Sequence, residues 1–598
     1  MFEEIPLKRP KTALLNRINS PADLRDLAEE SLYVLADELR HFLLYTVGKT
    51  GGHFGAGLGV IELTIALHKA FDTPEDQIIW DVGHQTYPHK ILTGRRELMH
   101  LLRKAGGIAP FPSITESPYD SFGTGHSSTS ISAALGLHMA RSKTAKKNNI
   151  VAVIGDGALT AGLAFEALNH VASSQGDILI IINDNAMAIS ENIGGLANWV
   201  SKANAGTGKQ LFSMSEEEDS AQNFFSGLGF KYEGPIDGHD IRQLLKALNE
   251  AKKQSGPRIL HVNTIKGKGY KPSELNPEKS HALSKIEASP ASKEGSWSKI
   301  FGDWICDKAA LDSKIVAITP AMKEGSGLTR FAKEYPDRFH DVAIAEQHAV
   351  AFAAGLSVGG VFPIVAIYST FLQRAYDQLI HDIAIQNLKV LFAVDRAGLV
   401  EDGPTHSGVF DISFVRSIPN LVIMVPSCNQ TLRKMLDFSY SYDGPSMVRY
   451  PRGSPNIGKE NGKIELGKGI VCFKGKEVAI LNFGALIDIG RIIAQFEGYT
   501  LVDMRFVKPI DEKLLEMLSL NHKLFVTLEE NTVVGGAGSA VLEAVSSKNL
   551  RVETLVIGVP DKFIEQDDPK SMRKAVKLTT DEVTSSVKKK LMQISSSD

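Results

Sequence analysis

IVAVIGDGA, residues 150–158, is an apolar run that ends in a Gly-Asp-Gly turn. A second apolar run ends in Asn-Asp-Asn in the stretch ILIIINDN, residues 178–185. Continuous Val and Ile runs of this kind are typical of parallel strands that helices cover on both faces. Parallel sheets bind ligands at the carboxyl ends of their strands. The sequence therefore predicts an α/β fold with Asp156 and Asn185 at its ligand-binding edge.

Apolar runs of the same kind fall into three sets along the chain and alternate with helical patterns, as in parallel α/β domains. They lie at residues 77–80, 150–154, 178–182 and 259–262, then at 315–318, 364–367, 390–394 and 421–425, and finally at 478–481, 501–503, 524–528 and 552–557. Polar linkers at 284–296 and 453–468 separate the sets. We predict three domains with mainly parallel sheets flanked by helices. Their predicted bounds are 1–295, 296–460 and 461–598, with a flexible loop at about 201–220 in the first.

The length, charge and cysteine content of the chain disfavour several classes of function. The chain has 598 residues, too many for a single core. Its formal net charge of −3 favours neither nucleic acid nor a membrane surface. The three cysteines are far apart and predict no disulfide framework or zinc site. The N-terminal segment is no secretory signal, and no apolar run approaches the ~20 residues of a membrane helix. We expect a cytoplasmic protein, with a processed organellar form as the alternative.

Asp156 and Asn185 supply a carboxylate and a carboxamide, which are hard oxygen ligands that suit a magnesium ion bound to phosphate oxygens. Gly157, followed by Ala158, allows the backbone to approach the phosphates closely. The alternative is an ordinary strand-terminal turn, where Asp, Asn and Gly are common. Together the two sequences resemble the GDG…N signature of thiamine diphosphate enzymes.

Glu346 lies in AIAEQHA, residues 343–349. One interpretation is an acidic first turn of a helix, which the helix dipole favours. Thiamine chemistry, however, needs a carboxylate that faces a ring nitrogen of the aminopyrimidine. AEQHA after a strand resembles the site of that glutamate, so we predict this role for Glu346.

Two histidines lie in glycine-rich turns: His53 in GGHFG, residues 51–55, and His84 in DVGHQ, residues 81–85. A lone histidine is more often structural, but these turns favour imidazoles that face a cleft and exchange protons near neutral pH. The loop GTGHSS, residues 123–128, resembles the segment around the diphosphate and thiazolium, and phosphate cradling fits it. Its candidate residues are Gly125, His126 and Ser127.

The predicted second domain supplies cations that suit phosphate or carboxylate capture. Arg396 follows an apolar run, and Arg452 lies in RYPRG, residues 449–453. Either arginine alone could be solvated or salt-bridged. The same predicted domain also contains DGPTH, residues 402–406. This segment favours a substrate site, because Asp402 and His406 can orient a polar substrate or move protons. The remaining candidates here are Tyr368, Arg374, Asp402 and His406.

Taken together, these segments resemble the 1-deoxy-D-xylulose-5-phosphate synthase family over essentially the whole chain. The resemblance is carried by GGHFG, DVGHQTYPHK, GTGHSSTSISAALG, GDGALTAGLAFEALN, NDNAMAIS, GPIDGHD, KGKGY, AIAEQHAV, YSTFLQRAYDQ and DGPTHSG. It implies a transketolase-like fold, homodimers and an active site between the first and second domains. The implied enzyme uses thiamine diphosphate and Mg²⁺ to condense pyruvate and D-glyceraldehyde 3-phosphate with loss of CO₂. Its product, 1-deoxy-D-xylulose 5-phosphate, leads to isoprenoid precursors and thiamine.

The resemblance also implies roles for individual residues. Asp156, Asn185 and the backbone carbonyl of Met187 are the implied metal ligands. Glu346 is the implied cofactor activator. Catalysis is implied for Glu346, His53, His281, Asp402 and His406. Substrate binding is implied for Tyr368, Arg374, Arg396 and Arg452. Cofactor binding is implied for His53, His84, Gly125, His126, Ser127, Gly157, Ala158, Asn185, Glu346 and Phe371.

The chain departs from the family pattern at two places. The loop at 201–220 is shorter than family members usually have. The segment 398–402 has one glycine fewer before its acidic pair, although the spacing from Asp402 to His406 is kept.

Three other functions compete with this interpretation. A transketolase-like enzyme would transfer a two-carbon ketol unit without releasing CO₂. A nicotinamide-dependent oxidoreductase lacks support, because no strand is followed by a clean G-x-G-x-x-G. A binding module without catalysis would not need Glu346, Asp156 and Asn185 together.

Overall fold

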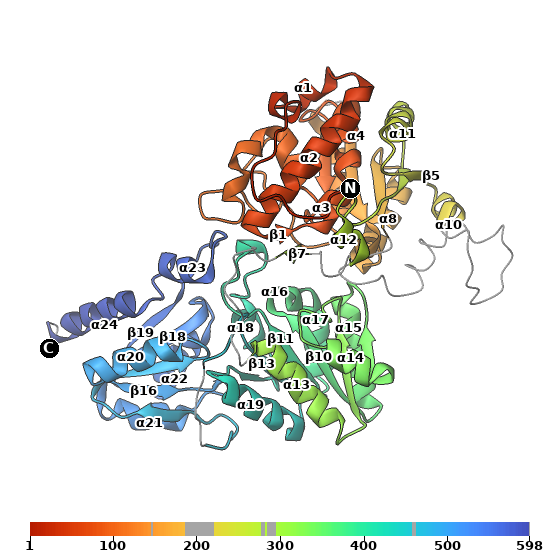
Figure 1. Ribbon diagram of the computed structural model, residues 1–598. Helices are drawn as coiled ribbons and strands as arrows, with labels where there is room; N and C mark the ends of the chain where they lie inside the picture. The colour runs from red at the N-terminus through yellow and green to blue at the C-terminus, as the bar shows by residue number, and fades with distance from the viewer. Residues whose placement is uncertain (145–147, 186–220, 277–281, 284–294, 457–461, 597–598) are drawn as a thin grey trace. The chain divides into compact units, whose positions relative to one another are not determined.

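The computed structural model describes residues 1–144, 148–185, 221–276, 282–283, 295–456 and 462–596 (Figure 1). The chain forms two compact units. The first comprises Met1–Ser289 with Ala343–Ala345, and the second comprises Pro290–Val342 with Glu346–Asp598. Within the described ranges, no helix has both the length and the apolar character needed to cross a membrane.

The first unit is built on a five-stranded parallel sheet with the order β2-β3-β4-β6-β5. Its strands are β2 (Gln77–Trp80), β3 (Ile150–Gly155), β4 (Leu179–Asp184), β5 (Lys231–Asp237) and β6 (Arg258–Asn263). The principal helices are α2 (Glu29–Thr50), α4 (Ile61–Ala70), α6 (Ser130–Thr144), α8 (Gly162–Ser174) and α11 (Ile241–Lys253). A two-stranded antiparallel pair joins β1 (Gly52–His53) to β7 (Ala282–Leu283).

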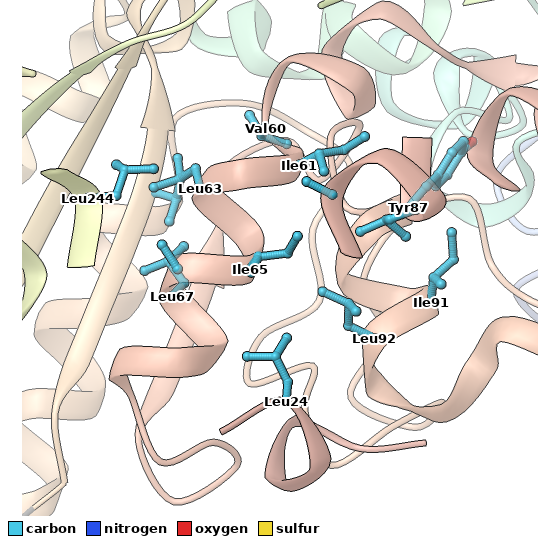
Figure 2. Packing of buried hydrophobic residues seen from close by; sticks show 14 of the residues in the cluster. Leu24, Val60, Ile61, Leu63, Ile65, Leu67, Tyr87, Ile91, Leu92 and Leu244 are labelled. Carbon is cyan, nitrogen blue, oxygen red and sulfur yellow. The ribbon is translucent and has the colours of Figure 1, made fainter. Parts of the chain in front are cut away.

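Alternation along β3 sends its side chains into two separate cores. Val151 and Val153 pack with α2, α4 and α11, whereas Ala152 and Ile154 pack with α6 and α8. In the first core, Leu63 and Leu67 of α4 point toward Leu244 of α11 (Figure 2). Both faces of the sheet are therefore covered, as the continuous apolar runs predict.

The second unit contains two sheets. The larger has the order β17-β12-β13-β11-β10-β8-β9 and is parallel except for β17. Its strands are β8 (Ile315–Thr319), β9 (Phe339–Asp341), β10 (Phe362–Tyr368), β11 (Leu391–Asp395), β12 (Val422–Met424), β13 (Ser446–Arg449) and β17 (Phe506–Lys508). The covering helices include α13 (Trp297–Ala309), α15 (Glu346–Val358) and α19 (Asn429–Ser441).

The smaller sheet has the order β14-β16-β15-β18-β19 and is parallel except for β14. Its strands are β14 (Ile470–Phe473), β15 (Glu477–Phe483), β16 (Thr500–Asp503), β18 (His522–Thr532) and β19 (Glu553–Val559). The flanking helices are α20 (Ile487–Glu497), α21 (Glu512–Ser519), α22 (Ala537–Ser547), α23 (Pro569–Ala575) and α24 (Thr580–Ser595). Mainly parallel sheets flanked by helices confirm the predicted fold class.

The two sheets of the second unit share a core, and β17 joins the larger sheet although its neighbours in the chain belong to the smaller one. β17 follows β16 in the chain but pairs with β12 of the larger sheet. Apolar residues of both sheets, such as Phe392 and Leu481, belong to one hydrophobic cluster. The described residues thus form three large sheets within two compact units, and the three predicted domains with their bounds stay a prediction.

Glu529 of β18 gives the smaller sheet a pH-dependent stability. Its buried carboxylate accepts hydrogen bonds from the backbone N–H groups of Ala537 (2.7 Å) and Gly538 (2.8 Å) at the start of α22. Burial nevertheless raises the pKa of Glu529 from 4.5 to about 7. Because the folded state holds this proton more tightly, the Glu529 contribution to stability falls as the pH rises from about 4.5 through about 7.

Glu529→Gln is expected to flatten this part of the pH profile. The difference in unfolding free energy between pH 5 and pH 8 should shrink by up to about 3 kcal/mol relative to the parent chain. Denaturant unfolding of the two proteins at both pH values measures the difference. Parallel profiles for the two proteins would show that Glu529 does not titrate in this range.

Candidate active site

The carboxyl ends of β3 and β4 bring two carboxylates together in the first unit. Asp156 begins the short helix α7 (Asp156–Leu159), and Asp184 is the last residue of β4. Burial and the neighbouring Asp184 raise the pKa of Asp156 well above its usual range, although the N–H groups of Gly157 and Asn185 oppose this shift. Two buried carboxylates in contact favour a bound proton or a bound cation.

A hydrogen-bonded chain leads away from this pair. His261 of β6 places Nε2 3.0 Å from Oδ2 of Asp184, and Tyr232 of β5 places its hydroxyl 2.7 Å from Nδ1 of His261. Since a carboxylate accepts, Nε2 carries the proton and the Tyr232 hydroxyl donates to Nδ1. Burial and the charge of Asp184 raise the pKa of Tyr232 to about 12. The chain fixes the orientation of Asp184 beside Asp156.

Asp81, which follows β2, organises the predicted diphosphate loop. Its buried carboxylate accepts hydrogen bonds from the backbone N–H groups of Ser128 (2.6 Å) and Ser130 (3.0 Å). The Ser128 hydroxyl donates to the carbonyl of Ala158 at 2.7 Å. The loop that carries Gly125, His126 and Ser127 is thereby tied to the turn after β3.

His53 and His84 lie close together in the first unit. Their ring centroids are 5.9 Å apart, and His53 lies 5.5 Å from the ring of Phe111. Burial, followed by the effect of His53, lowers the pKa of His84 to about 3, so its imidazole is neutral. Gly83 is required beside it, because a Cβ there would lie 2.5 Å from Oγ1 of Thr124.

In the second unit, Glu346 is the first residue of α15 and is buried. Its Oε2 lies 3.9 Å from Nη1 of Arg374. Burial raises the pKa of Glu346, while Arg374 and the backbone N–H of Glu346 oppose the shift. Glu346 is thus a carboxyl group that can hold a proton in a desolvated position.

Phe371 connects the other predicted residues of the second unit. Its ring stacks on Tyr368 with centroids 6.0 Å apart, and it meets the His406 ring edge-on at 5.6 Å. The Thr370 hydroxyl donates to the Thr405 carbonyl at 3.2 Å. The segments that carry Tyr368, Phe371 and His406 are therefore in contact.

Arg396 follows β11 and is held by several acceptors. Its Nη1 lies 2.8 Å from Oδ2 of Asp395 and donates to the Gly325 carbonyl at 2.7 Å. The guanidinium lies 4.1 Å from the centroid of the Tyr368 ring. Although burial opposes the charge, Asp395 and Tyr368 raise the pKa of Arg396. Arg396 is a permanent, oriented cation.

Arg396 and Arg452 line the same cavity, which has a volume of about 650 Å³. Arg452 donates to Oε2 of Glu401 at 2.8 Å. The other charged residues that line the cavity are Lys299, Asp303, Glu324 and Arg330. The two arginines that the sequence selected therefore face one space that is large enough for a small phosphorylated molecule.

Asp402 and His406 flank a short 3₁₀ turn, η7 (Gly403–Thr405). The backbone N–H of His406 donates to the Gly403 carbonyl at 3.1 Å, and Nδ1 of His406 lies 2.9 Å from Oγ1 of Thr405. Met187, His281 and the loop at 201–220 lie outside the described residues, so their predicted roles stay predictions.

Comparison with known proteins places this geometry in a family. The family model described as 1-deoxy-D-xylulose-5-phosphate synthase matches residues 15–220 and 213–264. The models for the transketolase pyrimidine-binding domain and the transketolase C-terminal domain match 293–456 and 467–583. A curated 1-deoxy-D-xylulose-5-phosphate synthase from Hahella chejuensis is 52% identical over 99% of this chain and 98% of its own length. The chain belongs to the 1-deoxy-D-xylulose-5-phosphate synthase family.

A second curated relative agrees with this assignment. A 1-deoxy-D-xylulose-5-phosphate synthase from Pseudomonas aeruginosa is 54% identical over 96% of both chains. A solved transketolase from Campylobacter jejuni is 16% identical, with a TM-score of 0.43, and is matched over 94% of this chain and 100% of its own. Membership of the 1-deoxy-D-xylulose-5-phosphate synthase family confirms the predicted family, the enzyme class of thiamine diphosphate-dependent transferases, and the cofactor thiamine diphosphate.

The first unit of this family member fits the diphosphate end of thiamine diphosphate. A Cβ added at Gly155 would meet no heavy atom of the described residues within 4 Å, so space remains beside the carboxyl end of β3. Burial and Asp184 raise the pKa of Asp156, so its carboxylate favours either a bound proton or a nearby positive charge. No group of three His, Cys, Asp or Glu side chains in the described ranges could hold a metal. Asp156 and Asn185 instead provide one carboxylate and one carboxamide.

Sequence reasoning missed Asp81, Asp184, His261 and Tyr232 as supports of the site. Asp81 and Asp184 could have been found from the sequence, because they lie at strand ends. Asp81 directly follows β2, and Asp184 ends β4 next to the predicted ligand Asn185. His261 and Tyr232 lie within β6 and β5, and only the strand order places them beside β4. Local sequence patterns carried no signal for them.

His261 is expected to support metal binding in this family member. His261→Asn should weaken the Mg²⁺-dependent binding of thiamine diphosphate by about 10- to 100-fold, because the partner that orients Asp184 is lost. Titration calorimetry with the cofactor at varied Mg²⁺ measures the change. Tyr232→Phe, which removes only the distal hydroxyl, should have a smaller effect. Unchanged affinity in His261→Asn would contradict the assigned role.

Proposed function

We propose that this chain condenses pyruvate with D-glyceraldehyde 3-phosphate, with loss of CO₂, to form 1-deoxy-D-xylulose 5-phosphate, the first step of the non-mevalonate route to isoprenoid precursors. The observation that carries this proposal is full-length similarity, at 52–54% identity, to curated proteins named 1-deoxy-D-xylulose-5-phosphate synthase. The described residues support the proposal, since Asp156 and Asn185 lie at the carboxyl ends of β3 and β4 in the first unit, and the second unit carries a buried Glu346 and a cavity lined by Arg396 and Arg452.

In this proposal the first unit holds the diphosphate. Asp156 and Asn185 would hold a Mg²⁺ ion, with the backbone carbonyl of Met187 as a third ligand, and the ion would offset the negative charge of the diphosphate. The loop bearing Gly125, His126 and Ser127 would present backbone and hydroxyl donors to the diphosphate. His84 is neutral, because its pKa is about 3, so it can accept or donate one hydrogen bond without adding charge.

The second unit would hold the pyrimidine end and the substrates. When bound, thiamine diphosphate supplies the electron sink that allows pyruvate to lose CO₂. Glu346 would hold and move a proton at a ring nitrogen of the pyrimidine, and its desolvated carboxyl suits that task. Phe371 would pack against the same ring.

The remaining predicted site residues would bind the charged and polar groups of the two substrates. Arg396 and Arg452 would bind the phosphate of the aldehyde with charge-assisted hydrogen bonds in the cavity that they line. Tyr368 would hold the Arg396 guanidinium, which lies over its ring. Arg374, Asp402 and His406 would orient the carboxylate and hydroxyl groups. His53 and His281 would transfer protons near pyruvate. We also propose a homodimer and a cytoplasmic location, on the family resemblance alone.

Arg452→Ala tests the assignment of the phosphate site. We expect KM for D-glyceraldehyde 3-phosphate to rise by about 10- to 100-fold, because a charged hydrogen bond to phosphate is worth about 1.5–3 kcal/mol. KM for pyruvate should change by less than about threefold. Steady-state kinetics with each substrate varied in turn measures both constants. Equal increases in the two constants would contradict the assignment.

A further inference from the structure

The segment 398–409, which we name the acidic loop, carries Asp402 and His406 and packs at both ends on the smaller sheet of the second unit, from here on called the C-terminal sheet. Leu399 and Val409, near its two ends, are 5% and 4% exposed. Both pack in the hydrophobic cluster of the smaller sheet, with Leu528 of β18 and Ile564. The ends of the loop are therefore anchored in a core that contains none of the predicted site residues.

Backbone hydrogen bonds close the acidic loop at its base. The N–H of Gly398 donates to the Gly408 carbonyl at 2.7 Å, and the N–H of Gly408 donates back to the Gly398 carbonyl at 2.8 Å. The N–H of Thr532 in β18 donates to the Val409 carbonyl at 2.8 Å. The loop is a closed turn that is bonded to the end of β18.

The side chain of Glu530, which forms an ion pair with Arg573, packs against Gly398, the first residue of the acidic loop. Arg573 of α23 grips Glu530 of β18 through two contacts, Nε to Oε1 at 2.9 Å and Nη2 to Oε2 at 3.1 Å. The Glu530 side chain is buried against Gly398, where an added Cβ would lie 2.8 Å from its Cδ. Gly398 also has φ +86, so other residues are disfavoured there. Arg573 thus holds the Glu530 side chain in contact with Gly398 at the base of the acidic loop.

A second wall comes from the segment between β19 and α23. Gly403, the residue after Asp402, has φ +72. A Cβ added to it would lie 2.7 Å from the backbone nitrogen of Gln566 and 2.9 Å from its Cα. Gln566 is itself 8% exposed. The turn that presents Asp402 is therefore packed directly on Gln566.

We propose that Glu530, Arg573 and Gln566 of the C-terminal sheet are positioning residues that fix the acidic loop, and through it Asp402 and His406. The inference rests on the proposed function, in which these two side chains orient substrate. It gives the C-terminal sheet a role in the reaction although that sheet carries none of the predicted site residues.

The test compares five full-length proteins in the presence of thiamine diphosphate and Mg²⁺: the parent chain, Arg573→Ala, Glu530→Gln, Arg573→Lys and Lys588→Ala. Lys588 is the control, because it forms a similar ion pair with Glu497 at 2.8 Å in the same sheet domain, away from the loop. Hydrogen–deuterium exchange of a peptide covering 398–409 is measured together with KM and kcat for pyruvate. Glu530→Gln is a second variant, which keeps the shape of the side chain if Arg573→Ala does not fold.

Arg573→Ala and Glu530→Gln should speed exchange in 398–409 at least about tenfold, because a buried carboxylate loses its partner or its charge. KM for pyruvate should rise about tenfold while kcat changes less than about threefold. Arg573→Lys should recover most of both properties, and Lys588→Ala should match the parent chain.

Unchanged exchange in 398–409 in both variants would overturn the proposal, as would an unchanged KM for pyruvate in spite of faster exchange. The exchange measurement does not depend on product formation. If the parent chain makes no 1-deoxy-D-xylulose 5-phosphate, the proposed function is refuted. The exchange rates of 398–409 still test whether Glu530 and Arg573 hold the acidic loop.

Discussion

Replacing Glu346 by Gln is expected to lower kcat by about 10²- to 10⁴-fold, the range for removal of a positioned acid–base group. The amide keeps the size and burial of the side chain but cannot exchange the proton that the raised pKa of Glu346 indicates. Binding of thiamine diphosphate should change by less than about threefold, since the diphosphate contacts are assigned to the first unit. Steady-state kinetics at saturating cofactor and calorimetric cofactor titration measure the two quantities.

Glu516→Gln is the matched control for Glu346→Gln. Glu516 lies on α21, a helix without predicted site residues, and its half-exposed side chain is 3.4 Å from Lys548. Its kcat should equal that of the parent chain. A Glu346→Gln protein that keeps more than about a tenth of the parent kcat would show that another group activates the cofactor.

Replacing Asp156 by Asn is expected to abolish the stabilisation that thiamine diphosphate and Mg²⁺ confer together. The carboxylate is the only charged member of the proposed ligand set, so Mg²⁺ affinity should fall at least about 100-fold. The cofactor-free variant should melt no lower than the parent chain, because the substitution removes a buried carboxylate that lies against Asp184. Thermal unfolding with and without cofactor distinguishes the two effects.

Asp26→Asn, on the exposed surface of the first unit, is the control for this experiment. It should show the full cofactor-dependent rise in melting temperature. If Asp156→Asn kept that rise as well, the metal site would have to lie elsewhere. If its cofactor-free form melted well below the parent chain, Asp156 would be a structural residue.

Sequence patterns predicted the elements that are local in the chain. The apolar runs at 150–154 and 178–182 became β3 and β4 because uninterrupted Val and Ile residues require a doubly covered sheet. The helix that was weighed as the alternative interpretation of Glu346 is present, since Glu346 begins α15, and its role at the cofactor stays a prediction. The geometry also brings His53 beside His84.

Features that depend on distant parts of the chain were not predictable in the same way. β17 has the short apolar sequence of an ordinary strand, but its pairing with β12 depends on how the two sheets of the second unit pack. β5 alternates exposed and half-buried residues, so it lacks the continuous apolar run used to find the other strands. Local patterns report burial and turns, not strand partners.

The same limit applies within the candidate site. Arg396 was predicted from its place after a strand, but its stacking on Tyr368 and its contact with Gly325 join segments far apart in the sequence. The acidic loop was identified by Asp402 and His406, whereas its supports Glu530 and Gln566 come from the C-terminal sheet. Residues that act by supporting others carry no motif of their own.

The central claim, condensation of pyruvate with D-glyceraldehyde 3-phosphate, is tested most directly with carboxyl-labelled pyruvate. We predict that the chain, with thiamine diphosphate and Mg²⁺, releases one labelled CO₂ for each 1-deoxy-D-xylulose 5-phosphate formed. Release of label should be lost in Glu346→Gln. Transfer of a two-carbon ketol unit from a ketose phosphate to an aldose phosphate, without release of label from pyruvate, would contradict the account and identify a transketolase activity instead.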